Sequence, residues 1–218
     1  MRPNSPRIPR LILLLTLCAS SLFAAGCDHK KDKDDPAPVP QFESKKAIVR
    51  FKRNDRIKTD FANALGIPEA NLCMELGLYS CTDLVHSVAL GAVEPYVIGL
   101  YEPLPRTGVT TPIVLDRVAL SGCAQRIDLD LANPAGALIF RGLPIGADGK
   151  LLDLQAPGVA SSLETMYRRG LQRHATEAEI NHLKSLYADV DASSPEAARD
   201  WALLSCFATL TTLESVFY

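Results

Sequence analysis

Residues 201–213 read WALLSCFATLTTL, and none of them carries a charge. In a helix, the apolar side chains of this stretch fall on almost every face, a pattern typical of a helix that other elements surround. Ser194 followed by Pro195 is a helix start, with a capping hydroxyl before a proline at the first helical position. We therefore expect the central buried helix of the fold to run from this start to Leu213.

Two amphipathic helices are predicted directly before the central helix. The first carries one apolar stripe at helical spacing, formed by Val159, Leu163, Met166 and Leu171. The second begins at the capping box Thr176-x-x-Glu179, and its expected buried residues are Ile180, Leu183, Leu186, Tyr187 and Val190. The short links between the three helices predict an antiparallel three-helix unit.

Three short helices are predicted earlier in the chain. The first has Ile57, Phe61, Ala64 and Leu65 at helical spacing and stops at Gly66 and Pro68. A second is expected over residues 68–76. For the third, Ser80 or Thr82 is the cap, Asp83 lies in the first turn, and the chain buries Leu84, Val85 and Val88 before Gly91.

The middle of the chain is predicted to hold one long helix, over residues 112–131, because Thr111-Pro112 has the form of a cap and first helical residue. Its apolar stripe is Val114, Leu115, Val118, Ala119 and Ile127. A strand at residues 127–131, where apolar and acidic residues alternate, is the alternative. Residues 93–111 are expected to form a loop with at most a short strand at 96–101, and residues 137–141 a short strand. The predicted fold class is mainly α, an irregular helical domain with at most short strands.

The N-terminus has the pattern of an export signal. Basic residues precede an apolar run from Leu11 to Phe23, which is too short for a membrane-spanning helix, and small residues follow it. The sequence Ala24-Ala25-Gly26-Cys27 resembles the lipobox of bacterial lipoproteins, although that family usually has Leu where Ala24 stands. The resemblance implies cleavage after residue 26 and acylation of Cys27, for example by palmitate, with simple cleavage and a free thiol as the alternative.

Beyond the signal at residues 1–26, the chain divides into a tether and one domain. Residues 27–41 begin with the lipidation site, continue with four Asp and three Lys in residues 28–35, and end with prolines at positions 36, 38 and 40. Such a segment buries no apolar surface and spaces a domain from a membrane. Residues 42–218 are expected to form a single globular domain, because the chain is 47% hydrophobic and 22% charged and therefore neither disordered nor collagen-like.

The charge of the mature chain disfavours nucleic acid as a partner. The signal holds three of the 23 Lys and Arg, so 20 basic residues face 25 acidic ones after cleavage. A local exception lies at residues 45–58, with seven basic residues in fourteen, which either touch lipid headgroups or form a solvated surface. They are Lys45, Lys46, Arg50, Lys52, Arg53, Arg56 and Lys58.

The remaining cysteines suggest disulfides, since an exported chain enters an oxidising compartment. Gly77 lets the chain turn back between Cys73 and Cys81, so this local pair is preferred, and Cys123 would then join Cys206. Three full pairings are formally open. Neither zinc nor covalent haem is expected, because the chain has no Cys-x-x-Cys. No cofactor is predicted.

Candidate catalytic residues are few. The chain has no Gly-x-Ser-x-Gly nucleophile elbow. His86 is the best general-base candidate, because Asp83 shares its predicted helix and Glu94 follows, but a packed helix histidine is the simpler interpretation. Arg168, Arg169 and Arg173 form either a solvated basic ridge or an anion site.

Two further patterns resemble parts of metal sites. Glu179-x-x-His182 has di-iron spacing without a second copy. An incomplete EF-hand pattern lacks the glycine at position six and the final Glu, and an ordinary turn between helices fits it better; its residues are Asp189, Asp191, Ser193 and Asp200.

The C-terminal third, with Met166-Tyr167-Arg168-Arg169, Thr176-x-x-Glu179 and Trp201-Ala202-Leu203-Leu204, resembles helical segments of uncharacterised planctomycete and myxobacterial envelope proteins. That resemblance spans about sixty residues and implies a redox neighbourhood but no haem and no catalytic residue. With the lipobox, it leads to the expectation of a lipid-anchored cell-envelope protein, at the inner or outer membrane, that binds or scaffolds an envelope partner. A periplasmic hydrolase or redox accessory enzyme is the alternative.

Overall fold

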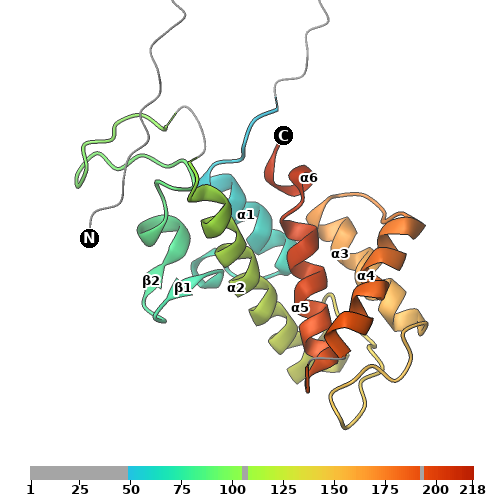
Figure 1. Cartoon of the computed structure of the whole chain (residues 1–218). Coiled ribbons are helices and arrows are strands. Elements are labelled where there is room, and N and C mark those ends of the chain that lie inside the picture. Colours follow the sequence, from blue (N-terminus) through green and yellow to red (C-terminus); the bar gives the residue numbers. More distant parts are fainter. Residues whose placement is uncertain (1–48, 105–107, 192–193) are drawn as a thin grey trace, which may run out of the picture. The chain divides into compact units, whose positions relative to one another are not determined.

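Helix α5 (Ala197–Leu210) runs through the middle of the folded unit, which begins at Ala47 (Figure 1). The computed structural model describes residues 49–104, 108–191 and 194–218. Trp201, Ala202 and Cys206 are fully buried, as expected of a central helix. The helix begins at Ala197, two residues after the predicted first helical residue, Pro195. Ser194 accepts a hydrogen bond from the amide of Glu196 and donates to Asp200 instead of capping the helix directly.

The predicted end of the central helix was also wrong. Helix α5 stops at Leu210, and the Thr212 hydroxyl accepts a hydrogen bond from the amide of Ser215 and so caps a separate short helix, α6 (Leu213–Val216). Three threonines, Thr209, Thr211 and Thr212, lie at this break, and each hydroxyl donates to a backbone carbonyl.

Helices α3 (Pro157–Gly170) and α4 (Glu177–Asp191) pack against α5 and against each other. The capping box is formed as predicted, with Thr176 and Glu179 each accepting a hydrogen bond from the backbone amide of the other. The indole of Trp201 donates to the carbonyl of Leu183 on α4 at 2.7 Å and meets the ring of Tyr187 edge-on. A mainly α fold is confirmed.

Helix α2 (Thr111–Ala132) confirms the long helix, and the alternative strand at residues 127–131 was wrong. All five residues of the predicted apolar stripe are buried. The helix lies against α5 on one side and against α1 (Asn54–Leu65) on another. Gly122 permits the close approach to α1, since a Cβ atom there would lie 2.7 Å from Leu65 and 2.8 Å from Leu72.

The end of α1 is held by two arginines from other helices. Gly66 is left-handed and terminates the helix as predicted. Arg169 of α3 donates to the carbonyls of Ala64 and Asn63 at 2.6 and 2.7 Å, and Arg126 of α2 donates to Leu65 at 3.4 Å. Cations at a helix C-terminus satisfy its free carbonyls and oppose its dipole. Arg169 is therefore part of the packing between helices.

Residues 68–91 differ from prediction. The expected helix over 68–76 is only a 3₁₀ turn, η1 (Glu69–Asn71), followed by the hairpin β1 (Met74–Glu75) and β2 (Tyr79–Ser80). Ser80 caps a single π-type turn, η2 (Cys81–Val85), by accepting from the amide of Asp83. Because this turn buries Cys81 and Thr82, Leu84 and Val85 face outward, 63% and 46% exposed, contrary to expectation.

Residues 93–104 form a loop, as expected, and neither the short strand allowed at 96–101 nor the one expected at 137–141 is present in the described chain. Residues 93–104 contain one isolated bridge, between Glu94 and Leu100. The amides of residues 138, 139 and 140 donate to the buried carboxylate of Asp130, at 2.8 to 3.0 Å, so they are not available to a neighbouring strand. Asp130 also forms an ion pair with Arg126 at 2.8 Å.

Disulfides join Cys73 to Cys81 and Cys123 to Cys206, which is the pairing preferred from the sequence. The first closes the β1–β2 hairpin. The second links α2 to α5 across the core, where both half-cystines are fully buried. Cys27 and the expected tether lie outside the described residues.

Replacing both Cys123 and Cys206 by Ala should lower the free energy of unfolding by about 4.5 kcal/mol, because the disulfide closes a long loop, with a sequence separation of 83. Replacing both Cys73 and Cys81 should cost about 2.5 kcal/mol for the short loop. Urea unfolding of the two double variants measures both values, and equal losses would contradict the loop-length argument.

Replacing Asp130 by Ala should destabilise the chain by about 3–5 kcal/mol, because it leaves Arg126 buried without its partner and three amides without their acceptor. Asp128 is the matched control on the same helix, since its exposed carboxylate pairs only with Arg199. Asp128→Ala should cost less than about 1 kcal/mol in the same thermal or urea measurement. Similar losses in the two variants would refute a structural role for the buried carboxylate.

Candidate functional site

The three candidate catalytic residues do not form one hydrogen-bonded set. The carboxylate of Asp83 lies 2.7 Å from the ammonium of Lys58, and this hydrogen bond lowers the pKa of Asp83. His86 Nε2 lies 3.1 Å from Glu75, which also pairs with Arg117. Glu94 accepts hydrogen bonds from the amides of the next loop residues. Each side chain therefore has a structural partner of its own.

The predicted metal patterns are likewise occupied by protein contacts. Glu179 pairs with Arg173 and with Thr176, which lower its pKa to about 2, while His182 Nδ1 lies 3.0 Å from the carbonyl of Ala178. In the EF-hand pattern, Asp191 pairs with Lys150, and Asp200 accepts from Ser194; Ser193 lies outside the described residues. Within the described ranges, no three His, Cys, Asp or Glu side chains are arranged to hold a metal ion.

The most unusual surface belongs to residues 93–104, here called the apolar loop. Figure 1 shows this loop standing away from the helices. Its side chains include Tyr96, Val97 and Tyr101, which are 95%, 82% and 77% exposed, and Ile98 and Leu104 are also exposed. Because isolated exposed apolar residues are ordinary but contiguous ones mark interaction surfaces, the apolar loop is the strongest binding candidate.

Hydrogen bonds hold the apolar loop in shape. Glu94 and Leu100 exchange two backbone hydrogen bonds of 2.9 Å, which close the base of the turn. The carboxylate of Glu94 accepts from the amides of Tyr96 and Val97, both at 3.2 Å. The side chain expected to serve near a catalytic site thus organises the tip of the apolar loop.

A hollow of about 1380 Å³ lies between the apolar loop, η2 and the residues that lead into α1. Its lining mixes apolar and polar groups, and the apolar side chains include Leu84, Val85, Val97 and Ile98. Phe217 and Tyr218 contribute to the opposite wall, where Phe51 packs edge-on against Phe217. His86, Glu94, Arg50 and Arg53 provide its polar edge. The surface continues beyond the hollow, since Val109 and Ile113 at the start of α2 are 92% and 69% exposed.

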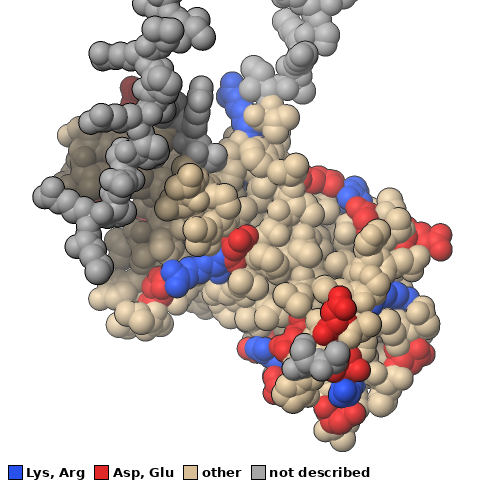
Figure 2. All heavy atoms as spheres, in the orientation of Figure 1, with Lys and Arg blue, Asp and Glu red and all other residues tan. Residues whose placement is uncertain are grey.

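Charged groups interrupt this part of the surface. In Figure 2 a short row of acidic and basic side chains crosses the upper part of α2, and more charged side chains gather toward the end of the unit that holds α4 and the start of α5. Arg117 of α2 pairs with Glu75 at 3.1 Å, so these two charges offset each other beside the hollow.

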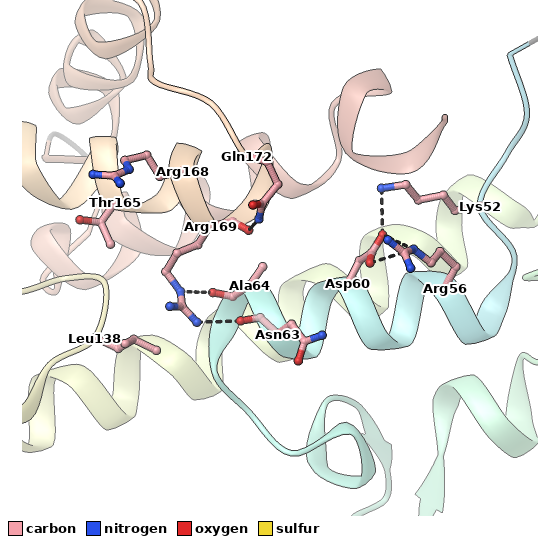
Figure 3. A pocket seen from close by; sticks show the side chains of 11 residues that line it. Lys52, Arg56, Asp60, Asn63, Ala64, Leu138, Thr165, Arg168, Arg169 and Gln172 are labelled. Carbon is pink, nitrogen blue, oxygen red and sulfur yellow. Dashed lines mark hydrogen bonds and ion pairs between the residues drawn. The ribbon is translucent and has the colours of Figure 1, made fainter.

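A second depression, of about 600 Å³, separates α1 from α3 and is lined by basic residues (Figure 3). Lys52 and Arg56 both point to the carboxylate of Asp60, at 2.9 and 3.0 Å. Arg169 donates to the α1 carbonyls. Arg168 points to the other side of α3 in this view, away from these groups. This depression therefore keeps a net positive charge, because the four basic side chains that line it share one carboxylate, that of Asp60.

Ion pairs with carboxylates also break up the basic stretch that the sequence shows at residues 45–58. Among its described members, Lys52, Arg56 and Lys58 bind the nearby carboxylates of Asp60 and Asp83. Arg50 and Arg53 face solvent. Lys45 and Lys46 lie outside the described residues. The structure does not form a continuous basic patch from residues 50–58.

Comparison with known protein families, with curated proteins and with solved structures gives no match. None of the helices in the part of the chain that the structure describes combines the length and apolar character needed to cross a membrane.

Glu179→Gln should destabilise the chain at neutral pH by about 1 kcal/mol or less, because it weakens the capping box and the pair with the partly exposed Arg173. The folded pKa of Glu179 is about 2 against an ordinary 4.5, so this stabilisation is present above pH 4.5 and is lost as the pH falls toward 2. Thermal unfolding across pH 2–7 should show the variant and the unmodified chain converging.

Glu177→Gln is the matched control for this pH dependence, since Glu177 is exposed in the same first turn. Its difference from the unmodified chain should be smaller at pH 7. A Glu179→Gln gap that stays constant down to pH 2 would show that the carboxylate charge contributes nothing.

Proposed function

We propose that this chain is a lipid-anchored cell-envelope protein that acts as a binding module. Cys27 carries the acyl chains, the segment up to residue 41 is the tether, and the helical domain presents the apolar loop and its hollow as the binding surface. The observation that carries this proposal is the cluster of contiguous exposed apolar side chains at residues 93–104.

Binding is a better account of this surface than folding. The apolar loop keeps Tyr96 and Val97 almost fully exposed, so their burial contributes little to stability. Glu94 nevertheless fixes the backbone beneath them. A rigid loop that holds apolar side chains in water has less entropy to lose when a partner covers it.

The lipobox supports the anchor. A basic leader, a short apolar run and a small-small-Cys sequence are the features by which lipoprotein signals are recognised, and Cys27 is the residue that such processing acylates. The Asp, Lys and Pro residues that follow suit a solvated spacer between membrane and domain. The four cysteines of the domain are used in disulfides, so acylation would leave a mature chain starting at Cys27 without a free thiol.

Intact mass of the membrane-extracted protein tests the proposal, measured with and without reduction and alkylation. We expect a chain that starts at Cys27, carries a diacyl or triacyl adduct, and takes up alkylating reagent at four thiols only after reduction. A Cys27→Ser variant should lack the adduct. An unacylated native chain would refute the anchor.

A further inference from the structure

The geometry points to the lipid bilayer as the partner of the apolar loop. Residues 93–104 would dip into the interfacial region of the membrane that carries the Cys27 anchor and so fix the orientation of the domain on that membrane. This inference rests on the proposed lipid anchor and names the partner of the proposed binding surface.

The first argument is where the chain enters the domain. Val49, Arg50 and Phe51 line the same hollow as Val97 and Ile98. The chain between the anchor and the domain therefore joins it beside the apolar loop, and tension or confinement from the membrane acts on this end of the domain. The far end, with the loop that contains Leu152, lies across the helices from it (Figure 1).

The second argument is the length of the connection. Residues 28–48 lie between Cys27 and Val49, and a fully extended chain of this length spans about 70 Å at most. Such a connection keeps the domain at high local concentration near the bilayer, so that a weak second contact suffices for docking. It is too long to impose an orientation by itself, and a surface contact is needed for that.

The third argument is the chemistry of the loop tip. Tyr96 and Tyr101 flank Val97 and Ile98, and the whole segment 93–104 contains no Lys or Arg. Tyrosine is enriched at membrane interfaces because its ring is apolar and its hydroxyl stays hydrated. Two tyrosines around an aliphatic tip match the layer between lipid tails and headgroups.

The backbone hydrogen bonds of this loop lower the cost of shallow insertion, compared with a loop whose amides and carbonyls are unpaired. Unpaired amides and carbonyls are costly in an apolar medium. In the apolar loop, the amides of Tyr96 and Val97 already donate to Glu94, and Glu94 and Leu100 pair through their backbones. The tip therefore enters an interface with part of its polar backbone satisfied.

Charge decides the expected lipid dependence. Around the loop and the hollow, the charges of Arg50 and Arg53 are equal in number to those of Glu94 and Glu102, and the nearby Lys52 and Arg56 share the carboxylate of Asp60, which leaves one positive charge. Docking through this surface therefore draws on apolar contacts, and we expect it to depend only weakly on anionic lipid.

The test uses the full, membrane-extracted lipoprotein with Ile98→Cys, in vesicles of neutral phosphatidylcholine. The native domain cysteines are paired, so the new thiol, at a site 62% exposed, takes an environment-sensitive fluorophore selectively. We expect brominated lipids to quench this probe at least twofold. The control is Leu152→Cys, 73% exposed at the far end, whose probe should stay unquenched.

A second variant asks whether the apolar tip is responsible. Val97→Asp in the Ile98→Cys chain should abolish quenching, whereas Leu152→Asp, at an exposed site on the far end of the domain, should leave it unchanged. Replacing 30% of the neutral lipid by phosphatidylglycerol should change quenching less than twofold. A larger change would assign the contact to Arg50 and Arg53 and overturn the apolar mechanism.

The remaining outcomes separate the inference from the proposed function. An acylated chain whose Ile98 probe is no more quenched than the Leu152 probe overturns membrane docking and leaves the anchor intact. A probe that shifts to an apolar environment without lipid quenching overturns it in favour of a second copy of the chain. Quenching in a chain without acyl groups supports the loop contact but refutes the anchor.

Discussion

The disulfide between Cys123 and Cys206 is the constraint on which the rest of the fold depends. It joins the two helices that the other helices pack against: α1 lies on α2, while α3 and α4 lie on α5. The chain between the two cysteines includes the largely irregular segment 133–156, in which the amides of residues 138–140 donate to Asp130 of α2. Fixing α2 against α5 thus also fixes where that segment lies.

The helices that were predicted correctly are those whose signals are local. The capping box at Thr176, the proline after Thr111 and the left-handed Gly66 each act within a few residues, so the sequence reveals them. A short strand was one expectation for residues 137–141, but the carboxylate of Asp130 on α2 accepts hydrogen bonds from the amides of residues 138–140. A contact between separate elements leaves no periodic signal, and for that reason the sequence did not predict it.

The candidate site shows the same difference between local signals and contacts that join separate elements. Asp83, His86 and Glu94 were selected because their chemistry is visible in the sequence, and the structure uses all three to hold loops and helices. The apolar loop was expected only as a loop. Its Tyr-Val-Ile run between Pro95 and Gly99 gave a signal, since an apolar run too short for a helix and without a partner strand has no obvious place in a core. Whether these side chains are buried, however, depends on which elements pack against the loop, and the sequence does not show that.

The exposed apolar side chains of this domain are held in position by other groups, among them a disulfide. Side chains such as Val97 and Tyr101 lie outside the core and add little to the stability of the free domain. The turn η2, one wall of the hollow, is held by the Cys73–Cys81 bond and by the burial of Cys81 and Thr82, and Leu84 and Val85 face outward from it. A disulfide and two buried side chains thus position a wall whose outward residues themselves add little to folding.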